Sequence, residues 1–331
     1  MSYQRIQTPK IYCDNINWLM TSGKMDSSDL TQSGITSVSP IEMFDMKPSN
    51  LITIGGNGVS TTHYININTT ITTDSNQDMN FVAIMGHNFK QAGLKFKIQT
   101  DDNSGFGSPK TPTMTPVVNC NLDVTNTYCE PDENGWSLLT FTQASDNQYI
   151  RVVIEPRYVE TPYATDIKIG SIMVGEHYEF PHSPDMGIKK SIDYDGVKKQ
   201  QSIGGQIYAN ASYLSGADWF LDPMRISTET NPNALRKTGR VNLDISFSYL
   251  ADTNIFSAEL FDKTHFIGTN NLMSNLIFRT HGGMLPMLFQ YDKDATNGED
   301  SFLWCRLNDT PSFTQVANRV WDTSIKLIEE Y

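Results

Sequence analysis

Two histidine-containing turns are the first places in this 331-residue chain where the residue types would suit catalysis. His87 lies in residues 85–88 and has the chemistry of a general base, but general-base catalysis needs a partnered nucleophile or carboxylate, which the local sequence does not supply. His281, followed by Gly282 and Gly283, is similar to the oxyanion-hole segment of esterases, yet the chain has no Gly-x-Ser-x-Gly elbow to use it. Both patterns therefore favour structural turns over catalysis.

Two glycine-containing loops have some features of phosphate and calcium sites. Residues 54–58 are glycine-rich after a strand, but they lack the dinucleotide-binding spacing and the Gly-Lys-Ser/Thr ending of a phosphate loop. Residues 292–298 place oxygens at alternating positions, but Asn297 stands where a calcium loop requires glycine, and no Glu closes the loop. We expect a turn at the first loop and a solvated hairpin loop at the second. The sequence predicts no catalytic, cofactor or metal site, and no enzyme.

Composition argues for a surface that meets other proteins. Hydrophobic residues make up 38% and charged residues 19% of the chain, and Asn, Thr, Ser and Gln fill the deficit. Neutral polar surfaces of this kind are common where one subunit lies against many others, and many extracellular β-proteins share the trait. The net charge of -12 disfavours nucleic-acid recognition, which needs clustered Lys and Arg. The two lysine pairs, 189–190 and 198–199, are interpreted as solvated positions beside a turn.

Cysteine usage and hydropathy indicate where the chain is made. The four cysteines are too few and too scattered for a disulfide framework, so free thiols are expected at Cys13, Cys120, Cys129 and Cys305. The first 18 residues have no continuous apolar core, and no segment offers the roughly 20 apolar residues that cross a bilayer. We expect synthesis in a cytoplasm without membrane insertion.

The elements that must position any site are mostly strands. From residue 241 to 250 the odd positions are apolar or aromatic and the even positions up to 248 are polar, which is the period of two of a strand with one buried face. Similar runs, bounded by Gly, Pro, Asn or Asp, occur at residues 94–99, 149–155, 167–174 and 321–330. The predicted fold class is mainly β, and strands without a reactive constellation are more typical of scaffolds than of enzymes.

The length favours two domains, because single cores seldom grow beyond about 250–300 residues. We predict an N-terminal arm at residues 1–34, a jelly-roll or β-sandwich domain at 35–185 and a β-barrel-like domain at 186–331, with a boundary at the prolines of residues 181–184. The arm carries Trp18, Leu19 and Met20 beside a polar stretch and is predicted to dock on a neighbouring subunit. A strap on its own subunit is the alternative.

Within the last domain, the sequence predicts one helix and one long hairpin. Residues 254–276 have a helical apolar pattern after Asp252 and Thr253. Asp195–Gly196 is a hairpin signal, with a strand expected on either side, over residues 190–194 and 198–210.

Several runs resemble known virion proteins. Residues 81–89, 94–99, 148–156 and 167–176 (FVAIMGHNF, LKFKIQ, QYIRVVIEP and IKIGSIMVGE) resemble the galactose-binding, or discoidin-like, β-sandwich module found in bacteriophage tail proteins. Gly86 permits the turn that this module needs, and Asn88 can hydrogen-bond its own backbone there. The layout of the second half is similar to the tail-tube or distal-tail type of β-barrel. The resemblance implies a tail, baseplate or tail-adaptor protein.

Carbohydrate binding is the alternative function. Sandwich modules bind sugars through exposed aromatic rings on end loops, and Phe106, Tyr128, Trp136 and Tyr158 fall in or beside loops. The preferred hypothesis is a non-enzymatic structural protein in the tail of a phage virion. It would assemble with copies of itself into a threefold or sixfold ring and contact other tail or connector proteins. The alternative is a protein on the virion surface that binds a receptor or a host glycan.

Overall fold

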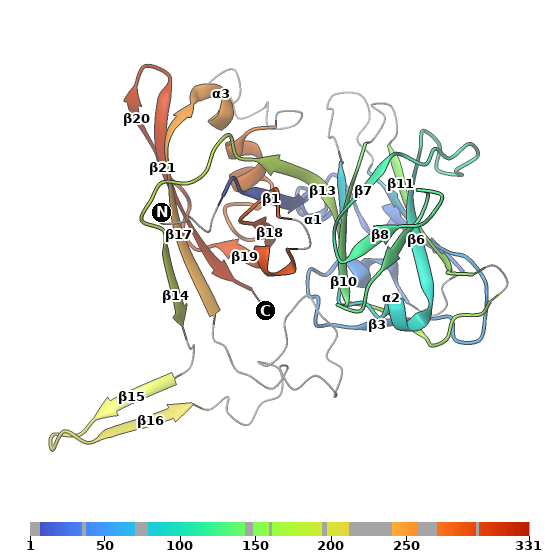
Figure 1. Cartoon of the computed structure of the whole chain (residues 1–331), viewed down its shortest axis with the longest axis horizontal. Coiled ribbons are helices and arrows are strands. Elements are labelled where there is room, and N and C mark those ends of the chain that lie inside the picture. Colours follow the sequence, from blue (N-terminus) through green and yellow to red (C-terminus); the bar gives the residue numbers. More distant parts are fainter. Residues whose placement is uncertain are drawn as a thin grey trace.

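The computed structural model describes residues 7–34, 38–69, 79–142, 148–158, 161–193, 197–211, 240–256, 270–295 and 298–330. The chain is mainly β, as the sequence predicts, and the ladders between its strands are antiparallel (Figure 1). The largest sheet has eleven strands. Its path runs through β14 (Lys189–Asp193), β17 (Arg240–Ala251), β21 (Val320–Glu329), β19 (Phe302–Leu307), β18 (Met287–Gln290), β1 (Lys10–Asp14), β13 (Ser171–Glu179), β5 (Phe81–Met85), β10 (Trp136–Phe141) and β7 (Met114–Val118), with β20 (Phe313–Ala317) beside β21.

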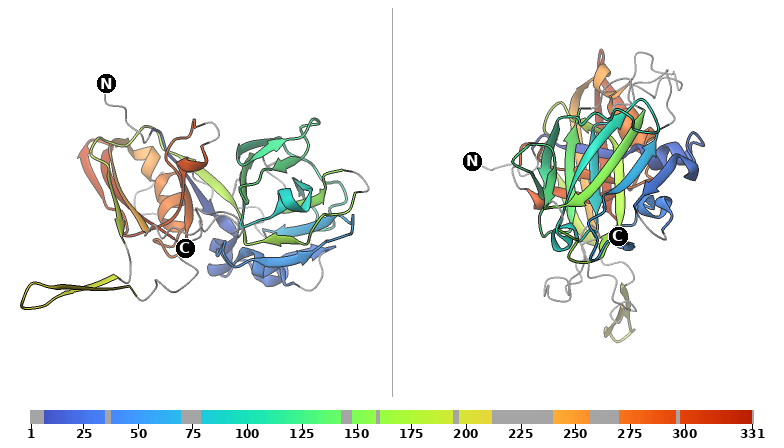
Figure 2. Two further views of the ribbon diagram at one scale, coloured as in Figure 1. Left: turned by 60° about the horizontal axis from the view of Figure 1, so that its bottom comes forward. Right: turned by 90° about the vertical axis from the view of Figure 1, so that its right-hand side faces the viewer.

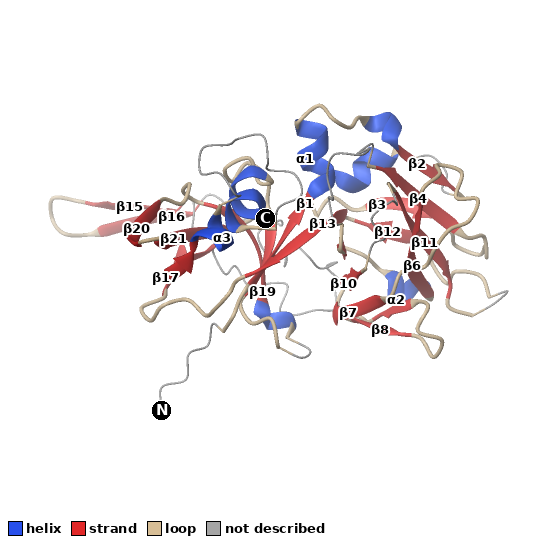
Figure 3. Cartoon of the chain, turned by 90° about the horizontal axis from the view of Figure 1, so that it is seen from above, coloured by secondary structure: helices blue, strands red, loops and turns tan. Residues whose placement is uncertain are grey.

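Three smaller sheets complete the strand content. A six-stranded sheet runs through β2 (Leu30–Ser33), β4 (His63–Asn68), β11 (Tyr149–Pro156), β6 (Leu94–Asp101), β9 (Cys129–Pro131) and β8 (Cys120–Leu122). Two pairs are β12 (Ile167–Ile169) with β3 (Ile52–Gly55) and β15 (Val197–Gln201) with β16 (Ile207–Ala211). The described helices are short (Figure 3): α1 (Asn15–Thr21), α2 (Phe89–Ala92), α3 (Asp252–Ile255), the 3-10 helices η1 (Ser27–Asp29), η2 (Pro40–Phe44) and η7 (Glu299–Ser301), and the π-helix η6 (Met273–Phe278).

The N-terminal unit is a β-sandwich. The six-stranded sheet packs on the part of the large sheet that contains β5, β10 and β13 (Figure 2). Their facing side chains form one apolar core, which includes Ile65, Val152 and Phe96 from the small sheet and Val82 and Ile84 from the large one. Alternation along each strand sends every second residue into this core. This sandwich confirms the predicted architecture of the first half.

Strand β5 is buried on both faces, which explains its uninterrupted apolar sequence. Val82 and Ile84 point into the sandwich core, whereas Phe81, Ala83 and Met85 belong to a second cluster on the opposite face. That second cluster also contains Leu288, Phe302 and Trp304 of β18 and β19. The two halves of the molecule are therefore joined by an apolar core of their own.

The large sheet curls strongly to make this junction. The rings of Trp136 in β10 and Phe302 in β19 lie 5.3 Å apart in an edge-to-face arrangement. In a flat sheet these strands, five positions apart in the strand order, would be separated by roughly 24 Å. The sheet must therefore fold back over its own face. Tyr12 of β1 contributes to the same cluster, with its ring 5.2 Å from that of Phe81.

The prediction of a detached N-terminal arm is wrong for the described residues 7–34. Strand β1 lies inside the large sheet between β13 and β18. Helix α1 follows at once, because the Asp14 side chain accepts hydrogen bonds from the backbone N–H groups of Ile16 and Asn17 and so caps it.

The three arm residues that were expected to contact a neighbouring subunit pack on the chain's own core. Trp18 is 8% and Leu19 0% exposed, and both belong to the sandwich core, while Met20 packs partly buried against it. The apolar patch that suggests a docking arm is thus satisfied within the subunit, as in the strap alternative. Burying these side chains stabilises the subunit itself.

The apolar cores cross both of the predicted domain limits. Leu19 and Leu30, from before residue 35, pack in the sandwich core. Tyr178 and Phe180, from before residue 186, pack with Phe247 in the core of the C-terminal unit, and the Phe180 and Phe247 rings stack 4.5 Å apart. A fragment of residues 35–185 would therefore lack part of its own core.

The C-terminal unit differs from its expected details in two places. The alternation puts Tyr249 on the buried face of β17, but Tyr249 is 79% exposed because the pairing register with β21 shifts between Phe247 and Leu250, and Tyr249 takes a positive φ of 61°. The helix expected over residues 254–276 lies mostly outside the described residues; α3 and the π-helix η6 lie near its two ends.

The close approach of β1 and β13 at the end of their pairing depends on a glycine. Gly175 lies opposite both Asp14 and Phe81 in the sheet, and a Cβ atom placed on it would lie 2.0 Å from the Cys13 carbonyl oxygen and 2.9 Å from the Asn15 backbone nitrogen. Both neighbouring atoms are backbone, so a side chain cannot be accommodated by a rotamer change. Only glycine fits here.

We predict that Gly175→Ala lowers the free energy of unfolding by about 1–3 kcal/mol or more, because overpacking must push the two strands apart. Gly107→Ala is the matched control, since nothing lies within 4 Å of a Cβ atom at that position. Urea denaturation measures both. Equal midpoints for the two variants would contradict this account of the close approach.

Candidate assembly surface

A two-stranded hairpin projects from the C-terminal unit. Strands β15 and β16 pair with each other and form a separate sheet that extends away from the body (Figures 1 and 2). The tip is closed by hydrogen bonds from the Ser202 backbone N–H to the Gln206 carbonyl at 2.8 Å and from the Gly205 N–H to the Ser202 carbonyl at 2.9 Å. Gly205 has a φ of 84°, which glycine adopts without strain.

This hairpin corrects the sequence interpretation of residues 198–210. The sequence predicts one strand there, but the chain reverses at Gly204 and Gly205. The predicted Asp195–Gly196 turn lies outside the described residues. Two glycines between two strand-like runs are a hairpin signal that would have located the tip.

The hairpin exposes large apolar side chains and lysines close together. From residue 198 to 209 every side chain except that of Ser202 is classed as exposed. Ile203 at the tip has a relative exposure of 111%, Ile207 of 65% and Tyr208 of 58%. Lys198 and Lys199 are the charged residues of the segment 197–211, so the hairpin is basic while the whole chain has a net charge of -12. Apolar and basic groups are thus presented together.

The two edges of the large sheet differ. Strand β14 pairs with β17 alone among the named strands, and all five of its side chains are exposed. At the opposite edge, β7 carries Pro116, which has no backbone N–H to offer a further strand. The edge beside the hairpin is therefore the more open one for pairing between chains.

Two of the four aromatic residues that suggest sugar binding, Phe106 and Tyr128, have cationic side chains over their rings. The Arg151 guanidinium lies 3.7 Å from the ring centroid of Phe106 and 4.6 Å from that of Tyr64. Lys95 and Lys97 place their ammonium groups 4.0 and 4.3 Å from the ring centroid of Tyr128.

These cation–π contacts form within the chain, and they occupy the faces of the aromatic rings on which a sugar would stack. The Lys97 ammonium also donates a hydrogen bond to the Tyr128 hydroxyl at 2.6 Å. Burial, a hydrogen bond to Glu155 and its negative charge raise the pKa of Tyr128, so its hydroxyl stays protonated. Trp136 is fully buried in the junction core. Of the four aromatic residues proposed from sequence, Tyr158 is the exposed one, at 65%.

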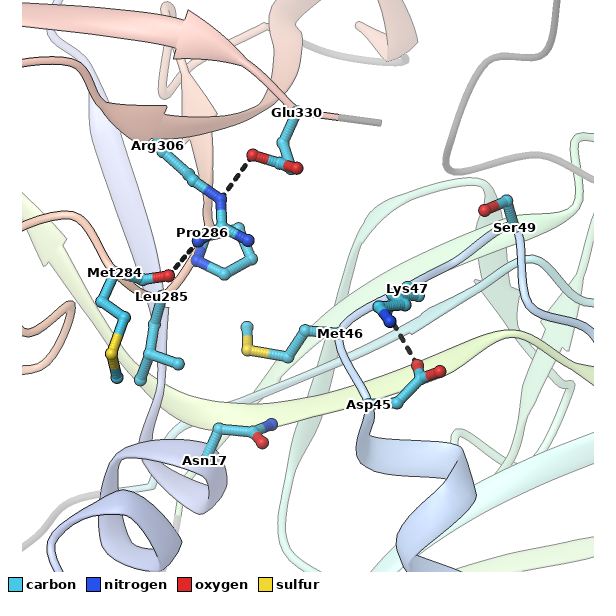
Figure 4. Close-up of a pocket in the computed structure, with 10 residues that line it drawn as sticks. All are labelled: Asn17, Asp45, Met46, Lys47, Ser49, Met284, Leu285, Pro286, Arg306 and Glu330. Carbon is cyan, nitrogen blue, oxygen red and sulfur yellow. Dashed lines mark hydrogen bonds and ion pairs between the residues drawn. The ribbon is translucent and has the colours of Figure 1, made fainter. Parts of the chain in front are cut away.

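A small cavity of about 220 Å³ opens where the two units meet (Figure 4). Three of its charged side chains are engaged by neighbours: Arg306 forms an ion pair with Glu330, and Asp45 accepts a hydrogen bond from the Lys47 backbone N–H at 2.8 Å. None of the described residues that line it is a histidine or a cysteine. The lining residues are Asn17, Asp45, Met46, Lys47, Ser49, Met284, Leu285, Pro286, Arg306 and Glu330.

The histidines singled out from sequence occupy structural positions. His87 is 1% exposed, its Nε2 lies 2.9 Å from the Ser137 hydroxyl, and its ring stacks on Phe89 at 4.2 Å. Burial lowers the pKa of His87 to about 3, so the ring is neutral at physiological pH and is closed to solvent. His281 lies on the surface with its Nε2 2.7 Å from the Thr21 hydroxyl.

The glycine loops also form turns. Gly55, Gly56 and Gly58 have positive φ angles, and the Asn57 backbone N–H donates to Asp166 at 3.1 Å. In the loop at residues 292–298, the Asp292 carboxylate accepts the backbone N–H of Asp294 at 3.0 Å, and residues 296–297 lie outside the described part. Within the described residues no group of three or more His, Cys, Asp or Glu side chains is placed to hold a metal ion.

The structure also describes the cysteines and the helices that the expectations of free thiols and of no membrane insertion concern. Cys13, Cys120, Cys129 and Cys305 are free thiols, and all four are buried. None of the described helices is both long and apolar enough to span a membrane.

No protein-family model matches the chain, and no curated protein matches it either. Among solved structures, the chain is similar to CBM32-1 from a family 31 glycoside hydrolase of Clostridium perfringens, with 10% identity, a TM-score of 0.31, and coverage of 45% of this chain and 96% of that one. It is also similar to truncated AlyQ with CBM32 and alginate lyase domains, with 12% identity, a TM-score of 0.29, and coverage of 92% and 98%. Similarity this low leaves the functional argument to the chain's own residues.

Proposed function

We propose that this chain is a non-enzymatic structural subunit of a phage virion, in its tail, baseplate or tail-adaptor region, and that it assembles into a symmetric ring. The observation that carries the proposal is the β15–β16 hairpin, which presents basic and apolar side chains away from its own body (Figure 1). The resemblance of residues 81–176 to the sandwich module of phage tail proteins supports the virion assignment.

In the proposed ring, the hairpin of each copy would contact the body of the next copy. An arm that reaches from one copy to the body of the next makes a heterologous contact, because the two surfaces in contact are different. Repeating that contact closes a ring when the rotation between copies divides a full turn, and threefold or sixfold closure would suit a phage tail. The joined core between the two units gives the body the rigidity that a repeated contact requires.

A structural role also fits the state of the groups that catalysis would use. His87 is neutral and enclosed, and Arg306, Glu330 and Asp45 of the junction cavity are engaged by neighbouring residues. The large sheet with its joined cores supplies a scaffold, and the hairpin supplies the contact.

We predict that the purified protein forms closed rings of uniform copy number at micromolar concentration. Negative-stain images would show annular particles, and native mass spectrometry would give a mass that is a multiple of the 37.2 kDa chain. The rings should dissociate as salt is raised, because contacts that involve exposed charges are screened. A single monomeric species at all concentrations and low salt would overturn the ring proposal.

Glycan binding is the second candidate, and Tyr158 is the observation that favours it. This ring is 65% exposed just after the end of β11, beside Arg157, which lies 5.7 Å from the ring centroid and pairs with Glu130 at 2.6 Å. An exposed tyrosine next to a fixed guanidinium can stack on a sugar and hydrogen-bond its hydroxyl groups.

If this candidate is correct, Tyr158→Ala will abolish retention on a column of host-surface polysaccharide without a change in melting temperature. Tyr249→Ala is the matched control, because Tyr249 is also an exposed tyrosine but lies on β17 of the C-terminal unit. Equal retention of wild-type protein and both variants, or no retention of any, would exclude Tyr158 as a sugar platform.

A further inference from the structure

We infer that the β15–β16 hairpin docks on the acidic body of a second copy of this chain, with Lys198, Lys199 and the tip residue Ile203 in the contact. This inference rests on the proposed assembly function and names its partner and its contact residues. Three observations support it: a hairpin of this size is not expected to be stable alone, it is basic, and both of its faces combine apolar and polar side chains.

An isolated hairpin of this size is not expected to be stable by itself. Each strand has five residues, and the pair belongs to no larger sheet within the described residues. Two-stranded hairpins are marginally stable in water, and three or more strands or a packing surface are needed for independent stability. The ladder from Gln201 opposite Ile207 to Lys198 opposite Asn210 therefore needs a surface to hold it.

Its own body does not supply that surface. The hairpin extends away from the large sheet in the views of Figures 1 and 2, and its side chains from residue 198 to 209 are exposed apart from that of Ser202. Five residues make each strand about 17 Å long. The partner must therefore lie beyond the chain's own surface.

Both faces of the hairpin are suited to burial. Residues directly opposite each other in the ladder share a face, so Lys199 and Gln201 lie with Ala209 and Ile207 on one side. Tyr208 lies opposite Gln200 on the other side. Each face thus combines apolar contact area with polar groups. A hairpin with two such faces suits a groove between surfaces or an added pair of strands at a sheet edge.

The positive charge of the hairpin favours an acidic partner. The hairpin carries two lysines and no acidic residue from 197 to 211, whereas the chain as a whole has 37 acidic and 25 basic residues. A basic arm and an acidic body attract between copies, and the same fields make bodies repel one another where no arm intervenes. A second copy is thus a partner with complementary charge.

The test uses a photo-crosslinker at the hairpin tip. Ile203→Cys adds a fully exposed thiol, while the four native thiols are buried and burial raises the pKa of Cys13 to about 12. A benzophenone maleimide will therefore label the tip selectively. Val124→Cys, whose parent side chain is equally exposed in a loop of the sandwich, is the matched control. Mixing labelled protein with isotopically heavy unlabelled protein distinguishes contacts between copies from contacts within one.

We expect crosslinks from position 203 to peptides of the heavy copy, and none above background from position 124. Lys198→Glu with Lys199→Glu should weaken self-association by at least about tenfold, measured by sedimentation, because like charges would then face each other. Lys90→Glu with Lys168→Glu makes the same charge change at exposed positions of the sandwich and should have little effect.

The outcomes separate this inference from the ring proposal. Crosslinks from position 203 confined to the light copy, or self-association that both double variants weaken equally, would overturn the hairpin contact while leaving rings possible. Crosslinks from position 203 to the heavy copy in protein that never forms rings would support the contact and overturn the ring.

Discussion

The structure depends on the place where β1 enters the large sheet between β13 and β18. The first half of β13 pairs with β5 in the sandwich, and its second half pairs with β1, which in turn pairs with β18 of the C-terminal unit. Gly175 marks the change from one partner to the other and leaves room for the backbone of β1. Because two strands serve both units, the halves cannot separate without breaking a sheet.

A buried ion pair reinforces this junction. Arg279 is the residue that follows the π-helix η6. Its guanidinium lies 2.5 Å from the Glu176 carboxylate of β13, and both side chains are less than a tenth exposed. Arg279 also donates to the Asn275 side chain at 2.6 Å, and the Cys13 thiol contacts the Asn275 carbonyl at 3.0 Å. A buried pair adds little net stability over an apolar packing, but breaking it leaves an uncompensated charge. It therefore fixes how η6 sits on β1 and β13.

The sequence locates β17, whose two faces differ, but it does not place β1 in the sheet or show the reversal between β15 and β16. The alternation at residues 241–250 locates β17, because one face of that strand is buried and the other is exposed. Strand β1 is buried almost throughout, so its apolar residues show no period and suggest an arm instead. The hairpin strands are exposed on both faces and give no period either. Pairing of β1 with β13 joins residues about 160 positions apart, a contact that local patterns do not report.

From the rigid body and its projecting hairpin we infer that copies of this chain meet through the hairpin. The most direct measurement is a cryo-electron microscopy map of the assembled particle at a resolution that traces β15 and β16. Our account predicts that the hairpin of each copy is seated on the body of the next, with Lys198 and Lys199 facing acidic side chains. A particle in which the hairpins extend freely into solvent and the copies meet through other surfaces would contradict it.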